Sequence, residues 1–215
     1  KREVGDFFFT IDGRVSNFQV KEFACHDESI VPGGTNEILI DGELVRKLQM
    51  CRDKFGVTII NSAYRTPEWN KRVGGVPNSQ HVQGKASDTV CKGTSPLEVA
   101  MYAEAIGMGG IGLYVKDNFT HIDTRTENIG RWIHNDKTNR DEGTQTFLKV
   151  IKFGSSGEYV RIAQRYLGIR DDGIFGNGTR KAVIEFQESH RDKNGNKLVA
   201  DGIVGPLTWV ALLTM

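Results

Sequence analysis

The clearest pattern of apolar and polar positions lies between residues 41 and 55, where apolar side chains recur at helical spacing. They are Leu44, Leu48, Cys51 and Phe55. Side chains three or four positions apart share one face of a helix, and the glycine at position 56 is a typical helix stop. The pattern predicts a helix over 41–55 with one buried face. Ser95 and Glu98 form a capping box around Pro96, which predicts the start of a second helix. We expect this helix to end at Gly107.

Short apolar runs predict the strands. Residues 57–61 read as a buried strand, and residues 110–115 with 119–124 read as a hairpin across a polar turn. Consecutive phenylalanines at 7–9, followed by an Asp-Gly pair at 12–13, indicate a further strand and turn. Helices and strands together predict an α+β domain, in which helices pack on a mixed, largely antiparallel sheet.

The last third of the chain contains a short internal repeat. D-G-I-F-G at 172–176 and D-G-I-V-G at 201–205 are each followed, three positions later, by a threonine. Each motif reads as a tight turn before a helix, and an amphipathic stretch at 160–167 adds a third helix. We therefore expect a small C-terminal domain of three helices.

A polar segment separates these two regions. Residues 135–146 read N-D-K-T-N-R-D-E-G-T-Q-T, a composition typical of a linker. We expect a larger domain over 1–134, a linker over 135–149 and the three-helix domain over 150–215.

Composition limits the classes of partner. The chain of 215 residues has 38% hydrophobic and 26% charged residues, which is typical of a globular protein with a sizeable core. Its net charge of +1 and its lack of a long apolar run favour neither nucleic acid nor a membrane as a partner. Three cysteines are too few for a disulfide framework. We expect a monomer.

The candidate chemistry begins in the stretch S-Q-H-V-Q-G-K-A-S-D at 79–88. His81 and Asp88 would converge if the loop folds back over a strand beginning near Asp88. One imidazole and one carboxylate form part of a zinc site, which needs at least one further protein ligand. His121 is the best candidate, because a strand over F-T-H-I-D would place His121 and Asp123 on one face. The alternative is that these three residues bind no metal and serve only as hydrogen-bonded parts of the fold.

The motif S-x-H-x-x-G-x-A-x-D with a later H-I-D resembles the zinc D-Ala-D-Ala carboxypeptidase family. That family includes phage endolysin peptidases and shares a fold with hedgehog signalling domains. The segment N-S-A-Y-R-T-P-E-W-N at 61–70 resembles the family's S-x-Y-R-x-P-x-x-N, and the Gly-Gly pairs at 74–75 and 109–110 match in position. The similarity covers about residues 17–132.

The resemblance implies a metallopeptidase site. It assigns His81, Asp88 and His121 as ligands of a catalytic Zn²⁺, with a fourth position left for water. Two nitrogens and one oxygen would also suit other divalent ions. Arg65 matches the family's substrate-facing arginine, whose guanidinium can hold a carboxylate or a polarised carbonyl oxygen.

The general base departs from the family pattern. Many relatives have an acidic residue three positions before the last histidine, where this chain has Asn118. Asp123 and Asp117 are the nearby acids. We favour Asp123 as the base. Its alternative role is to accept a hydrogen bond from a ligand histidine.

The C-terminal region carries a second resemblance. G-x-x-G-x-x-V-x-x-x-Q-x-x-L at 154–167, D-G-I-F-G-x-x-T and the pair F-Q at 186–187 are similar to the peptidoglycan-binding repeat of bacterial and phage wall hydrolases. The similarity covers residues 153–213 and implies peptidoglycan as a partner. A stabilising three-helix appendage without a ligand is the alternative.

Together these expectations describe a zinc peptidase of peptidoglycan, held to the wall by its C-terminal domain. It would be a D,D- or L,D-type endopeptidase or carboxypeptidase, cutting L-Ala–D-Glu, D-Ala–diamino acid or a terminal D-Ala. The anchor favours the two endopeptidase reactions. The alternative is a non-catalytic zinc-binding module for wall adhesion. The wall-binding repeat, and the lack of a signal-peptide pattern, indicate a phage-encoded endolysin released to the wall or a secreted bacterial autolysin.

Overall fold

The computed structural model describes residues 8–25 and 38–215. The chain divides into two compact units. They are Lys1–Ala103 with Met108–Gln145, and Glu104–Gly107 with Thr146–Met215.

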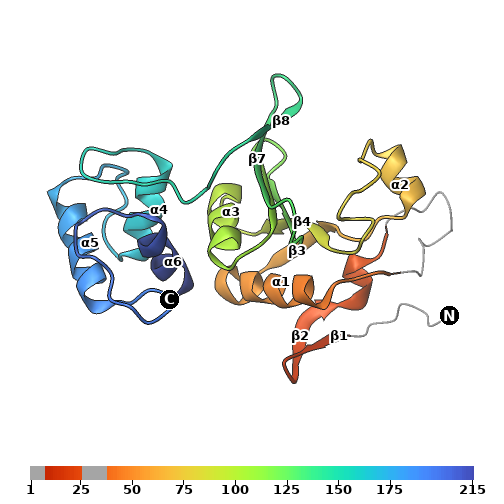
Figure 1. The fold of residues 1–215 in the computed structure, drawn as a ribbon, viewed down its shortest axis with the longest axis horizontal. Coiled ribbons are helices and arrows are strands. Elements are labelled where there is room, and N and C mark those ends of the chain that lie inside the picture. The colour runs from red at the N-terminus through yellow and green to blue at the C-terminus, as the bar shows by residue number, and fades with distance from the viewer. Residues whose placement is uncertain (1–7, 26–37) are drawn as a thin grey trace. The chain divides into compact units, whose positions relative to one another are not determined.

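A six-stranded sheet forms the centre of the first unit, with strand order β3-β4-β6-β5-β7-β8 (Figure 1). The strands are β3 Thr58–Ser62, β4 Ala86–Cys91, β5 Gly110–Tyr114, β6 Phe119–Asp123, β7 Gly130–Asn135 and β8 Arg140–Gly143. Neighbouring strands are antiparallel except for the parallel pair β5 and β7. The predicted α+β class with a mixed, largely antiparallel sheet is confirmed.

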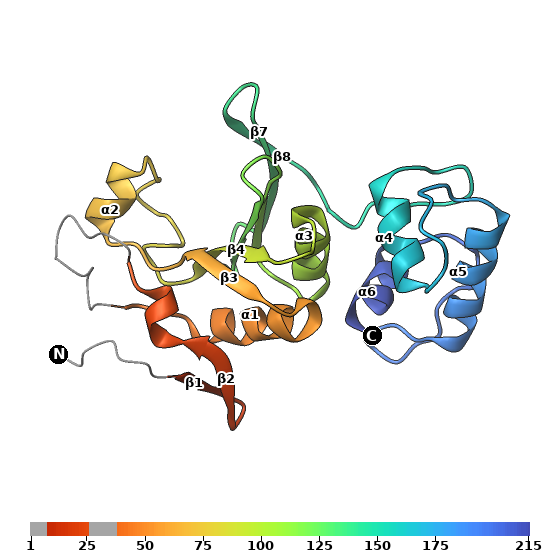
Figure 2. The same cartoon turned by 180° about the vertical axis from the view of Figure 1, so that it is seen from behind.

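Two helices, α1 and α3, pack on one face of this sheet (Figure 2). Besides the six strands of the sheet, the unit contains β1 Phe8–Ile11, β2 Arg14–Gln19, the 3-10 helix Val20–Phe23, α1 Gly42–Phe55, α2 Pro67–Arg72 and α3 Pro96–Ala105. The Thr120 hydroxyl on β6 donates to the Pro96 carbonyl of α3 at 2.9 Å. The Tyr102 hydroxyl of α3 donates in turn to the Met50 carbonyl of α1. Because side chains alternate along a strand, His121, next to Thr120, faces away from both helices.

One row of residues crosses the middle of the sheet. Asp88 pairs with His121, His121 with Gly112, and Gly112 with Trp132. Paired residues project to the same face, so the row lies on the face opposite α1 and α3. At Gly112 a Cβ would come 2.4 Å from the Trp132 ring, so the glycine leaves the space that the indole fills.

The polar segment that was expected to be a linker instead contains the edge of the sheet. Asn135 ends β7 and pairs with Arg140, where β8 begins. All four residues of β8 are exposed. An edge strand with a single neighbour tolerates charged side chains, so polar composition here indicates an exposed strand rather than a linker.

The second unit contains the three helices that the repeat predicted. They are α4 Glu158–Tyr166, α5 Asn177–Ser189 and α6 Pro206–Thr214. Trp209 of α6 is fully buried, and its indole N–H donates to the Lys149 carbonyl at 2.7 Å. Each D-G-I motif forms the turn before α5 or α6, as expected.

In each copy of the repeat, a buried glutamine forms hydrogen bonds with the D-G-I turn and with the repeated threonine. The Gln187 side-chain NH₂ donates to three oxygens, and its oxygen accepts from one backbone amide. These partners are Asp201 Oδ1 at 3.1 Å, the Ile203 carbonyl at 2.9 Å, Thr208 Oγ1 at 3.1 Å and the Gly202 amide at 2.9 Å. Gln164 makes the equivalent four contacts with Asp172, Ile174, Thr179 and Gly173. The repeated threonine of the motif is therefore a structural contact of this glutamine.

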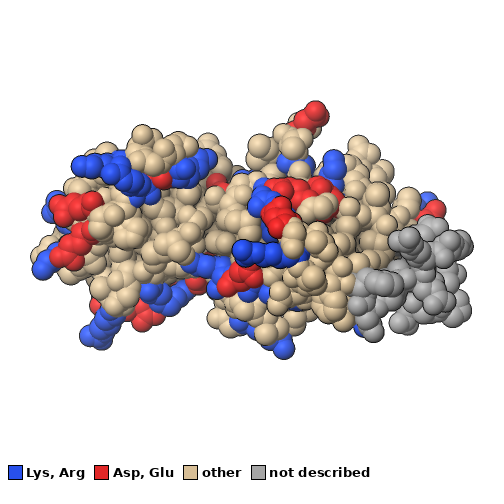
Figure 3. All heavy atoms as spheres, turned by 90° about the horizontal axis from the view of Figure 1, so that it is seen from below, with Lys and Arg blue, Asp and Glu red and all other residues tan. Residues whose placement is uncertain are grey.

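Charged side chains of both signs are interspersed on the face shown in Figure 3. This agrees with the net charge of +1. Among the helices of the described residues, none has the length and apolar character needed to cross a membrane.

Replacing Gln187 by leucine should lower the free energy of unfolding by about 2–4 kcal/mol. The Ile203 carbonyl and the Gly202 amide would then lose their side-chain partner in a buried environment. Urea unfolding of the full chain, followed by circular dichroism, measures the effect. Glu188→Leu changes the next, exposed residue of α5 and should alter stability by less than about 0.5 kcal/mol. Equal stability of the two variants would contradict this role of Gln187.

Candidate metal centre

Two neighbouring strands and one turn bring the three predicted ligands together. Asp88 and His121 are directly paired across β4 and β6. His81 lies in the turn before β4. In that turn Gly84 has a φ of +68°, and a Cβ there would come 2.2 Å from the Leu39 carbonyl oxygen. The glycine of the motif thus allows a close approach of two backbone segments and the return of the chain into β4.

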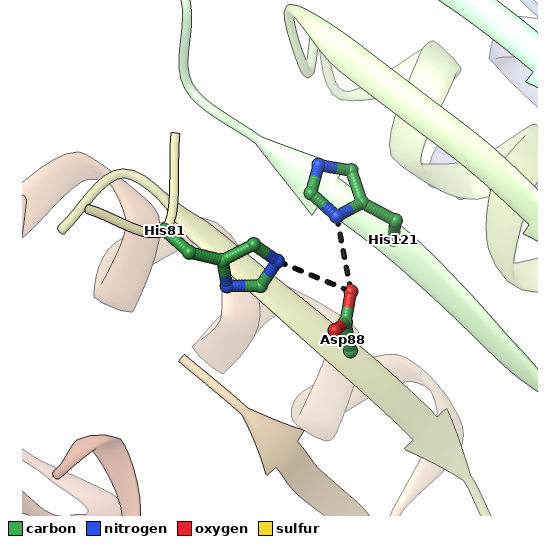
Figure 4. A group of neighbouring side chains, drawn as sticks. All are labelled: His81, Asp88 and His121. Atoms are coloured by element: carbon green, nitrogen blue, oxygen red, sulfur yellow. Dashed lines mark hydrogen bonds and ion pairs between the residues drawn. The ribbon is translucent and has the colours of Figure 1, made fainter. Parts of the chain in front are cut away.

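The three side chains form one buried cluster (Figure 4). One potential ligand atom from each lies within 4.8 Å of the others. Asp88 Oδ1 is 3.3 Å from His81 Nε2 and 3.0 Å from His121 Nδ1. Among the described residues, this is the group of acidic, histidine or cysteine side chains that could hold a metal ion.

Each histidine also has its second ring nitrogen held by an acceptor. His81 Nδ1 donates to the Ala63 carbonyl at 2.7 Å. His121 Nε2 donates to Asp123 Oδ2 at 3.1 Å. In the neutral form of each ring, which carries one N–H, these acceptors hold that proton, so the nitrogen directed toward Asp88 is the one that a metal ion would bind.

Burial and hydrogen bonding act in opposite directions on the pKa values of the cluster. Burial lowers the pKa of His81. Burial also opposes charging of His121, but hydrogen bonds with Asp123 and Asp88 outweigh it and raise the pKa of His121 to about 9. For the Asp88 and Asp123 carboxyls, hydrogen bonds from the histidines likewise outweigh burial and hold their pKa well below the usual range. The two carboxylates therefore keep their negative charge at neutral pH.

Asp123 lies behind His121, on the side away from Asp88. Its side chain is fully buried. Besides His121 it contacts Arg125, whose Nη2 donates to Oδ2 at 2.5 Å and whose Nε donates to Oδ1 at 2.8 Å. At Gly110 a Cβ would come 2.1 Å from the same carboxylate, so the neighbouring strand closes over it. This environment favours the orienting role of Asp123, the alternative in the sequence analysis, over the role of general base.

Arg65 reaches the cluster from the segment after β3. Its Nη2 donates to Asp88 Oδ2 at 2.5 Å, and its Nε donates to Ser62 Oγ at 2.9 Å. The contact with Asp88 uses the carboxylate oxygen that neither histidine contacts. Asp117, the other predicted acid, is exposed in the turn between β5 and β6. The pKa of His134 is raised mainly by a hydrogen bond with Asp141, and the charge of Asp117 adds to this after the charges of Asp141 and Asp136.

Comparison with known families covers both units of the chain. Residues 16–123 match the family Peptidase M15, and residues 156–212 match a putative peptidoglycan binding domain. The first match covers half of the chain and includes all three residues of the cluster. The chain belongs to the peptidase M15 family. The resemblance recognised from the sequence motifs is thereby confirmed.

Two individual proteins are similar to parts of this M15 chain. A probable peptidoglycan L,D-endopeptidase, MepK, from Haemophilus influenzae is 41% identical over 51 residues, which is 24% of this chain and 27% of that protein. The chain thus aligns with about a quarter of this relative's length. A crystal structure of a peptidoglycan-binding protein from Clostridioides difficile with glutamine hydroxamate shows 26% identity over 54% of this chain and 83% of that chain, with a TM-score of 0.27.

Two contacts of this M15 site were not predicted from the sequence. The Ala63 carbonyl that holds His81 is a backbone group, so no side-chain pattern could indicate it. Arg125 does have a signal, because it lies two positions after Asp123 and so on the same side of an extended chain. The ring centre of Trp132 lies 5.2 Å from that of His121.

Asp123→Asn tests whether this carboxylate orients His121. The variant loses the charged acceptor of His121 and the ion pair with Arg125, and we expect divalent metal affinity to fall about 10- to 100-fold. Competition with a chromophoric chelator measures the affinity, and circular dichroism checks the fold. Asp117→Asn, in the exposed turn, should leave metal affinity unchanged. Wild-type metal affinity in Asp123→Asn combined with lost peptide cleavage would instead identify Asp123 as the general base.

Proposed function

We propose that this M15 chain is a zinc-dependent peptidase that cleaves the peptides of peptidoglycan. The observation that carries the proposal is the arrangement of the two imidazoles, each with one nitrogen held by an acceptor and the other directed toward Asp88. Structural histidines need only satisfy their hydrogen bonds. Two imidazole nitrogens that converge on one carboxylate form the ligand set of a metal site, once the ion takes the place of the proton shared with the carboxylate.

His81 Nε2, His121 Nδ1 and the Asp88 carboxylate would hold the ion. Two nitrogens and one oxygen are a donor set that zinc accepts, with a position left for water or substrate. A zinc ion bound in this way lowers the pKa of its water and polarises a carbonyl. Asp123 and the Ala63 carbonyl hold the two imidazole rings in the required orientation.

Arg65 would act on both the ligand set and the substrate. Its guanidinium holds the second oxygen of Asp88 in place. A guanidinium at this position also supplies donors for a substrate carboxylate or for the negative charge that develops on a carbonyl oxygen during attack. Asp123 is buried behind His121, and Asp117 is exposed in the turn between β5 and β6, so we assign the general base to neither of them.

The substrate assignment rests on the second family match and on the relative with a printed activity. The C-terminal unit matches a peptidoglycan binding domain, and MepK is described as a probable peptidoglycan L,D-endopeptidase. A wall-binding unit tethers the peptidase to a dispersed polymer and raises the local concentration of its bonds. We therefore propose an endopeptidase that acts at the cell wall as an endolysin or autolysin, with peptidoglycan as its partner, and that cuts L-Ala–D-Glu or D-Ala–diamino acid.

His81→Ala should abolish cleavage of soluble stem peptides while the chain still binds isolated cell walls. Removal of one of three ligands prevents tight metal binding, whereas the C-terminal unit is unchanged. Mass spectrometry of purified peptidoglycan peptides detects the new amino terminus and identifies the bond. His190→Ala, a histidine of the C-terminal unit, is the control and should cleave as the wild type does. If the wild-type chain binds walls but releases no new amino terminus, the chain is a non-catalytic adhesion module.

A further inference from the structure

A polar cavity of about 510 Å³ lies next to the His81–Asp88–His121 cluster, outside the ligand set. Two segments form its walls, one at 78–85 and one at 125–128. Each wall is continuous in sequence with the cluster, because His81 lies within the first segment and Asp123 comes two positions before the second. The backbone amide of Thr124 donates to the Lys85 carbonyl at 3.0 Å and joins the two walls.

The lining of this cavity consists mainly of amides and cations. The amides are those of Asn78, Gln80, Gln83 and Asn128, and the cations are Lys85 and Arg125. One acid, Glu127, also lines it and is exposed. Groups of this kind recognise a polar, charged ligand rather than an apolar one.

The two cations differ in what they already bind. Arg125 is committed to the buried carboxylate of Asp123. Within residues 8–25 and 38–215, the ammonium of Lys85 forms no ion pair. Among the described residues, Lys85 is therefore the lining cation that has no carboxylate partner.

Gln80, one of the lining residues, also has an acceptor without a hydrogen-bond partner in the part of the chain that the structure describes. This acceptor is the side-chain oxygen, which is buried. A buried polar atom without a partner is costly, and turning the Gln80 amide toward a ligand N–H in the cavity would remove that cost. Gln80 and Lys85 both occupy variable positions of the S-x-H-x-x-G-x-A-x-D motif.

We propose that this cavity is a substrate subsite, in which Lys85 binds a free carboxylate of the stem peptide and Gln80 accepts a hydrogen bond from a peptide N–H; this rests on the proposed function. Stem peptides differ from ordinary peptides in carrying free carboxylates along their length, on γ-linked glutamate and on diamino acids. A subsite for such a carboxylate, beside the metal ligands, makes Lys85 a determinant of substrate specificity.

The test pairs variants of Lys85 with amidated substrates. Soluble stem peptides are prepared with each carboxylate in turn converted to a carboxamide, and kcat/KM is measured with the zinc-supplemented full chain. For the wild type, one of these amidations should lower kcat/KM about 10- to 100-fold, the range of a charge-assisted hydrogen bond. Lys85→Met should show the same loss with the unmodified peptide and no further loss on that amidation. Lys85→Arg should keep the wild-type preference.

Lys92→Met, at an exposed lysine in the turn after β4, is the matched control and should behave as the wild type does. Undiminished sensitivity of Lys85→Met to every amidation would overturn the subsite while leaving the proposed function intact. If the wild type cleaves no peptide, the proposed function fails, and calorimetric titration of the same peptides decides the subsite. Affinity that depends on one carboxylate in the wild type but not in Lys85→Met supports it, and equal dependence in both overturns it.

Discussion

The pairing of Asp88 with His121 across two antiparallel strands is the contact on which the rest of the site depends. A shift of one residue between β4 and β6 would turn one of these side chains toward α1 and α3. The hydrogen-bonded ladder on both sides of β6 prevents this shift. His81 then needs only a short turn, closed by a glycine, to reach the carboxylate. The sheet therefore sets the geometry of two ligands, and the loop adds the third.

Burying two imidazoles and two carboxylates is costly unless each polar atom has a partner. In this cluster the acceptors behind the rings serve that purpose. The Ala63 carbonyl holds one histidine, and Asp123 holds the other with the help of Arg125. The same contacts that stabilise the buried groups select the tautomer of each ring. One hydrogen-bond network thus gives the buried polar atoms their partners and holds the rings in the orientation that a metal ion would need.

Much of the fold could be predicted from short-range patterns. The apolar stripe of α1, the hairpin of β5 and β6, and the three C-terminal helices each have a periodicity or a turn motif that local sequence reveals. Strand β8 could not be predicted, because an exposed edge strand can be as polar as a linker. The three cluster residues were found through their motif. The contacts around these residues could not be predicted, because they depend on a backbone carbonyl at position 63 and on which side of His121 the Asp123 carboxylate lies.

We propose that His81, Asp88 and His121 share one zinc ion. Anomalous diffraction at the zinc edge, from crystals of the full chain grown with zinc, tests it most directly. We expect one strong peak about 2.0–2.2 Å from His81 Nε2, His121 Nδ1 and an oxygen of Asp88. The absence of a peak at these three residues, in a chain that still cleaves peptidoglycan peptides, would contradict it.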